Sequence, residues 1–410
     1  MTNRVAQSEF PKEFGASTRE FAPIDFRNRF PALDGLRALA ILAVFFEHYG
    51  GGSHGGKLMM LVNRVRLYGW VGVDLFFVLS GFLITGILYD TLGDSHYFKR
   101  FFARRSLRIF PIYYLVFAVL FALTPFLLYQ WRPGHLLFLV YLGNFLGNYD
   151  FSYYDIASRR FASATVEIGH FWSLCVEEQF YLLWPPLVYA VRRRRSLLVA
   201  AALLSLSAVA LRMGLYLYGG AELSERWSVR TLPFRVDSLL AGAMLALLLR
   251  GSRSDAVQRS CKWAFLVGSA GAIGIFSLSG SLRDLLYSGF AFSFTALASA
   301  GLIGCTLRAG STAYKVFDWK PLRTLGKYSY GFYIYHLLFA KLWIALLVLL
   351  GTRLHSLAAA GAIALPLNFV TTFLVAKVSY DFYEKRFLRY KVHFEYDTEL
   401  SAHRHAFEAR

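Results

Sequence analysis

The stretch LRALAILAVFFEHYG, residues 36–50, is apolar except for Arg37, Glu47 and His48. A helix that crosses a membrane needs about 20 mainly apolar residues. Arg37 and His48 lie eleven residues apart, which at about 100° per residue places them on one helix face. Ionisable residues inside a membrane face the bundle interior and mark functional sites. The stretch therefore predicts a membrane helix with a functional face, although Arg37 also fits an interfacial anchor and His48 a helix end at the outer surface.

Apolar runs of this kind recur along the whole chain. Of its 410 residues, 56% are hydrophobic and 17% are charged, whereas soluble domains average about 25% charged residues. We therefore predict an all-α fold, a polytopic membrane helix bundle with about ten transmembrane helices. The predicted spans are residues 31–50, 69–90, 110–129, 173–191, 197–218, 231–249, 263–279, 286–307, 328–350 and 358–380.

The run 135–148, HLLFLVYLGNFLGN, is short for a membrane span. Basic loops stay in the cytoplasm, and the basic loops 99–108 and 192–195 both lie inside only if 135–148 does not cross. We predict a short re-entrant or surface segment here and both termini in the cytoplasm. Charge alone leaves an eleventh crossing open. The net charge of +18 is then a topology signal, and no nucleic-acid partner is expected.

Three regions are expected along the chain. Residues 1–29 are polar and mixed in charge, which is typical of a disordered cytoplasmic tail without a signal peptide. Residues 30–385 are predicted to be one membrane domain, and residues 386–410 a cytoplasmic C-terminal tail. The three cysteines have no spacing typical of a metal site or a disulfide framework.

Two further stretches place charges in or beside predicted spans. VGVDLFFVLSGFLIT carries Asp74, which must pair or bind something inside a membrane. A salt bridge to a neighbouring helix and a functional role are equally compatible with it. The loop KRFFARRSLR carries Arg104, Arg105 and Arg108, and Arg104 and Arg108 would share one helix face. Guanidinium groups suit phosphates, but ordinary topology charge and lipid headgroup binding explain the loop equally well.

A third stretch, HFWSLCVEEQFYLLWP, begins at residue 170 and enters a span from the outer side. Ser173 fits a helix cap and Glu177 an acid in the first turn. The adjacent acids Glu177 and Glu178 exceed what capping requires. Trp172 fits either an interfacial anchor or a platform on which a sugar stacks.

Taken in order, the motifs resemble the acyltransferase type 3 family of integral membrane acyltransferases, which includes O-acetylases of bacterial surface glycans. The resemblance runs from about Phe30 to Glu384. It rests on LDGLRALAIL followed by His48, VGVDLFFVLSGFLIT, RRSLRIFPIYYL, HFWSLCVEEQFYLLWP, LPFRVDSLLAGAML, YSYGFYIYH and YDFYEKRFLR.

The resemblance implies a role for each candidate residue. His48 becomes the general base, or a transient carrier of the acyl group. Arg37 lies on the same face, toward the donor. The phosphates of coenzyme A are expected at Arg105 and Arg108, with Arg104 beside them. The polar lining that orients His48 or the acceptor is expected from Asp74, Glu177, Arg235 and Asp237, and the acceptor is expected to contact Trp172, Ser173, Arg235, Asp237 and Tyr335.

The implied function is transfer of an acyl group, acetyl in most of the family, from cytoplasmic acyl-CoA to a carbohydrate hydroxyl. No metal is expected. The implied location is the cytoplasmic membrane of a bacterium, among membrane lipids. Because no hydrolase-like domain is expected after Glu384, any second transfer step would need a separate periplasmic partner. A transporter or exporter of a glycan or small anionic metabolite is the alternative. His336 is expected to be a packed, hydrogen-bonded histidine.

Overall fold

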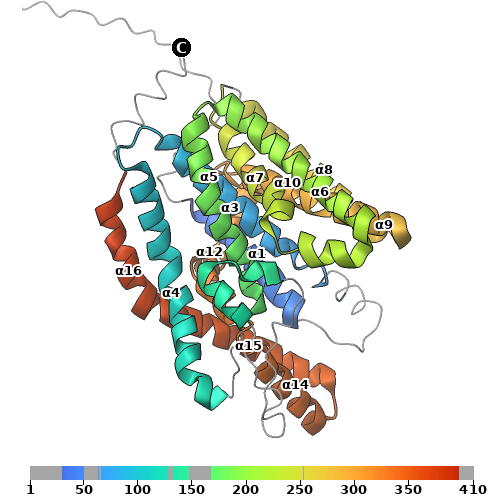
Figure 1. The fold of residues 1–410 in the computed structure, drawn as a ribbon. Helices are drawn as coiled ribbons and strands as arrows, with labels where there is room; N and C mark the ends of the chain where they lie inside the picture. Colours follow the sequence, from blue (N-terminus) through green and yellow to red (C-terminus); the bar gives the residue numbers. More distant parts are fainter. Residues whose placement is uncertain are drawn as a thin grey trace, which may run out of the picture.

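A computed structural model describes residues 30–49, 63, 66–127, 133–146, 168–252 and 254–396, and every regular element among them is a helix (Figure 1). This confirms the predicted all-α bundle. The α-helices are α1 (Pro31–Tyr49), α3 (Val71–Asp90), α4 (Tyr97–Leu127), α5 (Trp172–Val191), α6 (Arg194–Ser228), α7 (Leu232–Leu248), α8 (Ser254–Ser277), α9 (Gly280–Leu286), α10 (Phe292–Thr306), α11 (Thr312–Phe317), α12 (Lys320–Lys327), α13 (Ser329–Tyr335), α14 (Ala340–Leu354), α15 (Leu357–Ser379) and α16 (Lys385–Arg389).

Short 3₁₀ and π turns join or extend these helices. The 3₁₀ turns are η1 (Pro133–Val140), η2 (Gly143–Leu146), η3 (Gly169–Phe171) and η6 (Tyr390–Phe394). The π turns are η4 (Tyr287–Ala291), which continues α9 into α10, and η5 (Tyr380–Glu384), which continues α15 into α16.

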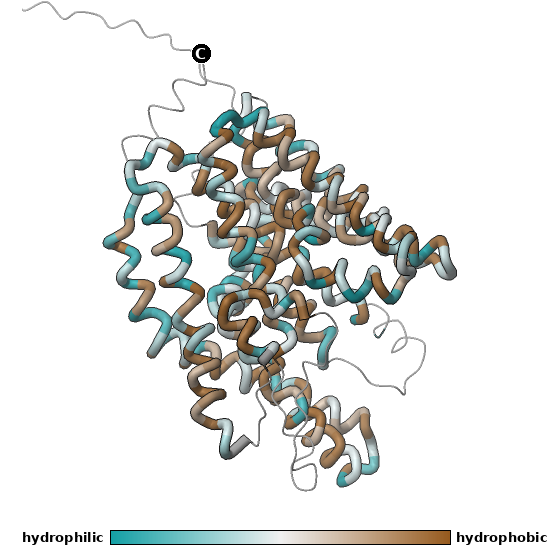
Figure 2. The backbone as a smooth tube through the Cα atoms, in the orientation of Figure 1, coloured by the Kyte–Doolittle hydropathy of each residue, from teal (hydrophilic) through white to brown (hydrophobic). Residues whose placement is uncertain are grey.

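Where the structure describes them, the ten predicted apolar runs fall on helical segments, with residues 328–350 divided between α13 and α14. The protein is a multi-pass membrane protein. Within the described ranges, six helical segments are long and apolar enough to cross a membrane, or seven if the bent pair α13–α14 is one broken span. The predicted number of about ten spans is larger because it also counted α1, α5 and α7. Helix α7 has only 17 residues, α1 carries several charges, and α5 carries two acids and two prolines. Figure 2 shows hydrophobic residues along much of the length of the long helices.

Helix α3 lies at the centre of the bundle and is the most buried of the six long segments. Its backbone approaches that of α7 closely at two glycines. A Cβ atom on Gly81 would lie 1.8 Å from the carbonyl oxygen of Leu239, and one on Gly242 would lie 1.9 Å from that of Val78. Small residues allow this approach between membrane helices. Gly81 and Gly242 therefore set how closely α3 and α7 pack.

The segment predicted to be short and re-entrant or surface-lying contains no long helix. The two 3₁₀ turns η1 and η2 have eight and four residues. The hydroxyl of Tyr113 donates to the carbonyl of Phe138 at 2.6 Å, and the Gln179 amide donates to the carbonyl of Tyr141 at 2.8 Å. These bonds fix the segment against α4 and α5.

The predicted N-terminal tail lies outside the described residues, as do residues 397–410. The first part of the predicted C-terminal tail is helical, since α16 and η6 continue to Phe394. The guanidinium of Arg104 on α4 donates to the carbonyls of Lys391 and Phe394, each at 3.2 Å. The chain after the last long helix thus returns along α4 (Figure 1).

Candidate functional site

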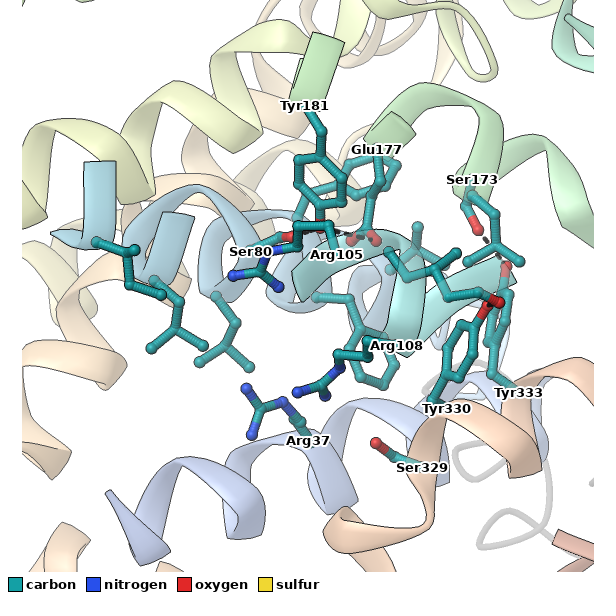
Figure 3. A pocket seen from close by; sticks show the side chains of 18 residues that line it. Arg37, Ser80, Arg105, Arg108, Ser173, Glu177, Tyr181, Ser329, Tyr330 and Tyr333 are labelled. Carbon is teal, nitrogen blue, oxygen red and sulfur yellow. Dashed lines mark hydrogen bonds between the residues drawn. The ribbon is translucent and has the colours of Figure 1, made fainter. Parts of the chain in front are cut away.

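Two neighbouring cavities lie among α1, α3, α4, α5, α13 and the C-terminal turns. The inner cavity has a volume of about 230 Å³ (Figure 3) and the second cavity about 330 Å³. Arg37, Leu83, Arg108 and Tyr330 line both of them. These four side chains therefore form the boundary at which the two cavities meet.

Three arginines to which the family resemblance gives a role toward the donor, Arg37, Arg105 and Arg108, face the inner cavity. Figure 3 shows the guanidinium groups of Arg37 and Arg108 close to each other, with Arg105 near Ser80. Arg37 is paired with Asp34, one turn earlier, at 2.5 Å. Within the part of the chain that the structure describes, no carboxylate forms a salt bridge with Arg105 or Arg108. Two cations without a salt bridge beside a third make this part of the cavity positive, which favours an anion.

Arg104 does not face the inner cavity, although it lies one turn before Arg108. Its guanidinium contacts main-chain carbonyls of η6 and lies 5.4 Å from the centre of the Tyr396 ring. The prediction that Arg104 joins the other two arginines at one binding site is therefore not met by the geometry. The sequence offered no sign that the C-terminal segment returns to this helix.

Hydroxyl and carboxyl groups also line the inner cavity, some of them beside Arg105 (Figure 3). The Ser173 and Tyr333 hydroxyls are 2.5 Å apart, and the Tyr333 hydroxyl donates to the carbonyl of His170 at 2.8 Å. The Tyr181 hydroxyl donates to Glu177 at 3.3 Å and also bonds to Ser80 (Figure 3). The structure thus brings the predicted residues Ser173 and Glu177 into the cavity with the arginines.

His48 lies outside this cavity, at the C-terminal end of α1, and its side chain is exposed. It is connected to the cavity wall by ring contacts. The His48 and His336 ring centres are 5.4 Å apart, and those of His336 and His170 are 5.0 Å apart. The His336 and Tyr333 ring centres are 5.3 Å apart. A continuous row of rings therefore leads from His48 to Tyr333.

Hydrogen bonds to carbonyls fix the tautomers of these histidines. Because a carbonyl only accepts, the contact of His48 Nδ1 with the Val44 oxygen at 2.7 Å places the proton on Nδ1 and leaves the lone pair on Nε2. His336 also carries its proton on Nδ1, which donates to the Tyr333 carbonyl at 2.6 Å. His336 is buried as expected, but its Nε2 has no hydrogen-bond partner among the described residues.

These histidines also satisfy the end of a broken helix. Helices α13 and α14 meet at an angle of 71°, so the last carbonyls of α13 lose their ordinary partners. His336 Nδ1 donates to the Tyr333 carbonyl, and His170 Nε2 donates to the Ile334 carbonyl at 3.1 Å. The Tyr49 hydroxyl donates to the carbonyl of His336 at 2.5 Å.

Asp74, Arg235 and Asp237 form a separate buried network that lines neither cavity. Arg235 pairs with Asp74 at 2.6 Å, and Asp237 pairs with Arg212 at 2.8 Å. The Ser238 and Thr295 hydroxyls complete the bonds to Asp74 at 2.7 and 3.1 Å. Of the two alternatives for Asp74, the structure shows the salt bridge to a neighbouring helix. Arg235 and Asp237 thus pair with residues of other helices and not with each other.

Two other candidate acceptor residues lie outside both cavities. Trp172 packs its ring against Phe77, with ring centres 6.1 Å apart. The Tyr335 hydroxyl donates to Ser379 at 3.0 Å. Sequence reasoning gave no role to Tyr333, Lys327 or Lys391, which line one cavity or the other. Lys327 and Lys391 lie in predicted cytoplasmic segments. Basic residues are common in such segments, so the sequence did not single out either lysine.

Comparison with known proteins decides the family. Residues 30–377 match the acyltransferase 3 family, described as an acyltransferase domain. The chain belongs to the acyltransferase type 3 family. This confirms the resemblance based on the seven motifs. The matched region includes the cavity-lining residues up to Lys377 but not those of the C-terminal turns η5 and η6. No solved structure matches the chain.

Three curated relatives are similar to this acyltransferase type 3 chain over most of its length. YrhL of Bacillus subtilis (strain 168) is 30% identical over 372 residues, covering 87% of this chain and 54% of the relative. The peptidoglycan O-acetyltransferase OatA of Listeria monocytogenes is 29% identical over 376 residues, covering 87% and 56%. The O-acetyltransferase OatA of Staphylococcus aureus (strain NCTC 8325) is 27% identical over 326 residues, covering 75% and 50%. The chain thus spans about half the length of these relatives.

Proposed function

We propose that the protein is a membrane O-acyltransferase that moves an acetyl group from acetyl-CoA to a hydroxyl of a cell-wall glycan. The observation that carries the proposal is the pair Arg105 and Arg108, which line a cavity without carboxylate partners among the described residues. The family match supports acyl transfer. The name of the Listeria relative, a peptidoglycan O-acetyltransferase, supports the choice of acceptor.

The donor enters from the side on which α1 begins and α4 carries its arginines. The distribution of basic loops predicts that this side is cytoplasmic, which is where acyl-CoA is made. Arg105 and Arg108 hold phosphate oxygens of the donor through charge-assisted hydrogen bonds. The pantetheine arm then runs through the inner cavity past Ser173 and Tyr333 (Figure 3) and presents the thioester carbon to the acceptor hydroxyl beside His48.

His48 acts at the other end of the ring row. Its Nε2 lone pair, left free by the Nδ1 bond to Val44, accepts the proton of the acceptor hydroxyl. The hydroxyl oxygen forms a bond to the thioester carbon, the carbon–sulfur bond breaks, and the coenzyme A thiolate takes up a proton. In the second version His48 first receives the acyl group itself and then passes it to the acceptor. Both versions need His48, and both place the acceptor at the C-terminal end of α1.

The proposal extends to the setting of the enzyme. The chain lies in the cytoplasmic membrane of a bacterium with both termini in the cytoplasm. The glycan acceptor is reached on the outer side, and a separate periplasmic partner carries out any second transfer. Basic residues concentrated in the loops on one side of the predicted bundle support this orientation.

The test uses purified protein in lipid nanodiscs with radiolabelled acetyl-CoA and solubilised peptidoglycan fragments. We expect release of coenzyme A and label in the glycan, both lost in His48→Ala. The exposed Arg195 on α6 supplies a control, because Arg195→Ala should leave turnover unchanged. Normal turnover in well-folded His48→Ala contradicts the role of His48. Uptake of an unmodified glycan or anionic metabolite into vesicles, without turnover of acetyl-CoA, favours the transporter alternative.

A further inference from the structure

Most residues that line the second cavity belong to the family motifs, but four of them, including two lysines, lie outside the motifs. Its wall comes from the start of α1, the junction of α12 and α13, the π turn η5, helix α16 and the turn η6. Two lysines line it, Lys327 at the end of α12 and Lys391 in η6. They join Arg37 and Arg108, which face the inner cavity as well.

The balance of charge in this cavity is positive. Of its two carboxylates, Asp34 is paired with Arg37 at 2.5 Å, and Glu384 is buried and accepts a bond from Ser379 at 3.3 Å. Lys391 and Arg108 form no salt bridge within the described ranges. The charged groups that act most strongly on Lys391 are Arg108, Arg105 and Arg104, all cations. Such a group of cations is stabilised by a bound anion with more than one negative charge.

Aromatic rings line the same cavity. Tyr328 and Tyr380 meet edge to face with ring centres 5.3 Å apart, and the ammonium of Lys327 lies 4.9 and 4.8 Å from their centres. Tyr330 separates this cavity from the inner one. Flat rings beside cations suit a ligand that has both an aromatic base and phosphates.

The turn that carries Lys391 is held in place from α4. Arg104 donates to the main-chain carbonyls of Lys391 and Phe394. Its guanidinium is thus used for positioning, while Arg105 and Arg108 on the same helix face the cavities. This arrangement explains why three arginines so close in sequence have different surroundings.

We propose that the second cavity binds the adenosine of the acyl-CoA donor with its 3′-phosphate, and that the diphosphate lies where the two cavities meet, held by Arg108 with Arg105 beyond it. Lys327 and Lys391 contact the 3′-phosphate and select a nucleotide-bearing donor, and Arg104 is a positioning residue for Lys391. The pantetheine arm passes between Arg37 and Arg108 into the inner cavity. The inference rests on the proposed function and adds a donor specificity that the C-terminal segment provides.

The first experiment compares acetyl-CoA with acetyl-pantetheine, which lacks the nucleotide. In Lys327→Ala/Lys391→Ala we expect the KM for acetyl-CoA to rise about tenfold or more, as for loss of charge-assisted phosphate bonds, with kcat unchanged. The KM for acetyl-pantetheine should not change. Lys391→Arg should restore most of the affinity. Lys385, exposed and in the same segment, supplies the control Lys385→Ala, which should match the wild type.

Arg104→Ala gives the readout for the positioning role. The variant should have a higher KM for acetyl-CoA and an unchanged KM for acetyl-pantetheine, although Arg104 itself does not line either cavity. Equal effects on both donors, or no effect on either, in the lysine variants overturn the nucleotide subsite while leaving acyl transfer intact.

The second experiment needs no turnover, so it separates this inference from the proposed function. Radiolabelled adenosine 3′,5′-bisphosphate is bound at equilibrium to the wild type in phosphatidylcholine nanodiscs. We expect saturable binding that acetyl-CoA displaces and that weakens in the double lysine variant. Absence of binding overturns the proposal. Displacement by phosphatidylglycerol added to the nanodiscs also overturns it, because the cations would then serve lipid headgroups.

Discussion

Two groups of arginines in this protein look alike in sequence and differ in structure. In the group around α3, α7 and α10, Arg235 and Arg212 each pair with an aspartate at 2.6 and 2.8 Å, and all four side chains are buried. In the group on α4, Arg105 and Arg108 face cavities and have no carboxylate partner within the described residues. The first group is neutralised by its own aspartates, whereas the second has no salt bridge among the described residues. Removing one partner of a buried ion pair leaves an unpaired buried charge and destabilises the fold, whereas gathered cations without a salt bridge favour binding of an anion.

The largest expected effect comes from breaking the first group. Arg235→Ala leaves Asp74 buried without its cation, which costs about 3–5 kcal/mol in comparable cases. We expect little folded protein and a sharply lower thermal midpoint in detergent. Adding Asp74→Ala should recover part of the loss, since no buried charge is then left alone. Unchanged stability in Arg235→Ala would contradict the structural role of this pair.

A smaller loss is expected where α3 meets α7. Gly81→Ala places a Cβ against the carbonyl of Leu239, and such overpacking costs about 1–3 kcal/mol. The thermal midpoint should fall, because the helices that carry Asp74 and Arg235 must separate. Gly274→Ala in α8 is the matched control, since its Cβ would meet nothing within 4 Å. Equal midpoints for the two alanine variants would show that the close approach is not needed.

The smallest effect on stability is expected in the second group. Arg105→Ala/Arg108→Ala removes neighbouring like charges, so the thermal midpoint should stay the same or rise. The affinity for acetyl-CoA should fall about tenfold or more, equivalent to about 1.4 kcal/mol or more, as measured by equilibrium binding. A loss of stability comparable to that of Arg235→Ala would place these arginines in the structural class and remove the main support for a donor site.

The sequence predicted local features well and long-range ones poorly. Apolar runs located the helices, because a membrane helix can be recognised from the composition of one continuous stretch of sequence. Family motifs brought Arg37, Ser173 and Glu177 to one region. The pairing of Asp74 with Arg235, 161 positions away, does not follow from spacing on one helix. The spacing of Arg104 and Arg108 puts them on one helix face and predicts a shared role. Arg104 instead donates to carbonyls of the C-terminal turn η6, and spacing cannot reveal that this turn returns to α4.

The break between α13 and α14 affects how inactive variants should be interpreted in a genetic screen. His170 and His336 donate to carbonyls that this break leaves open, so replacing either one exposes main-chain polar groups inside the bundle. Such a screen will recover both histidines beside His48, although neither needs to take part in the chemistry. Abundance in the membrane, measured alongside activity, separates the two kinds of variant. Only a histidine whose loss silences a protein present at normal amount belongs to the reaction.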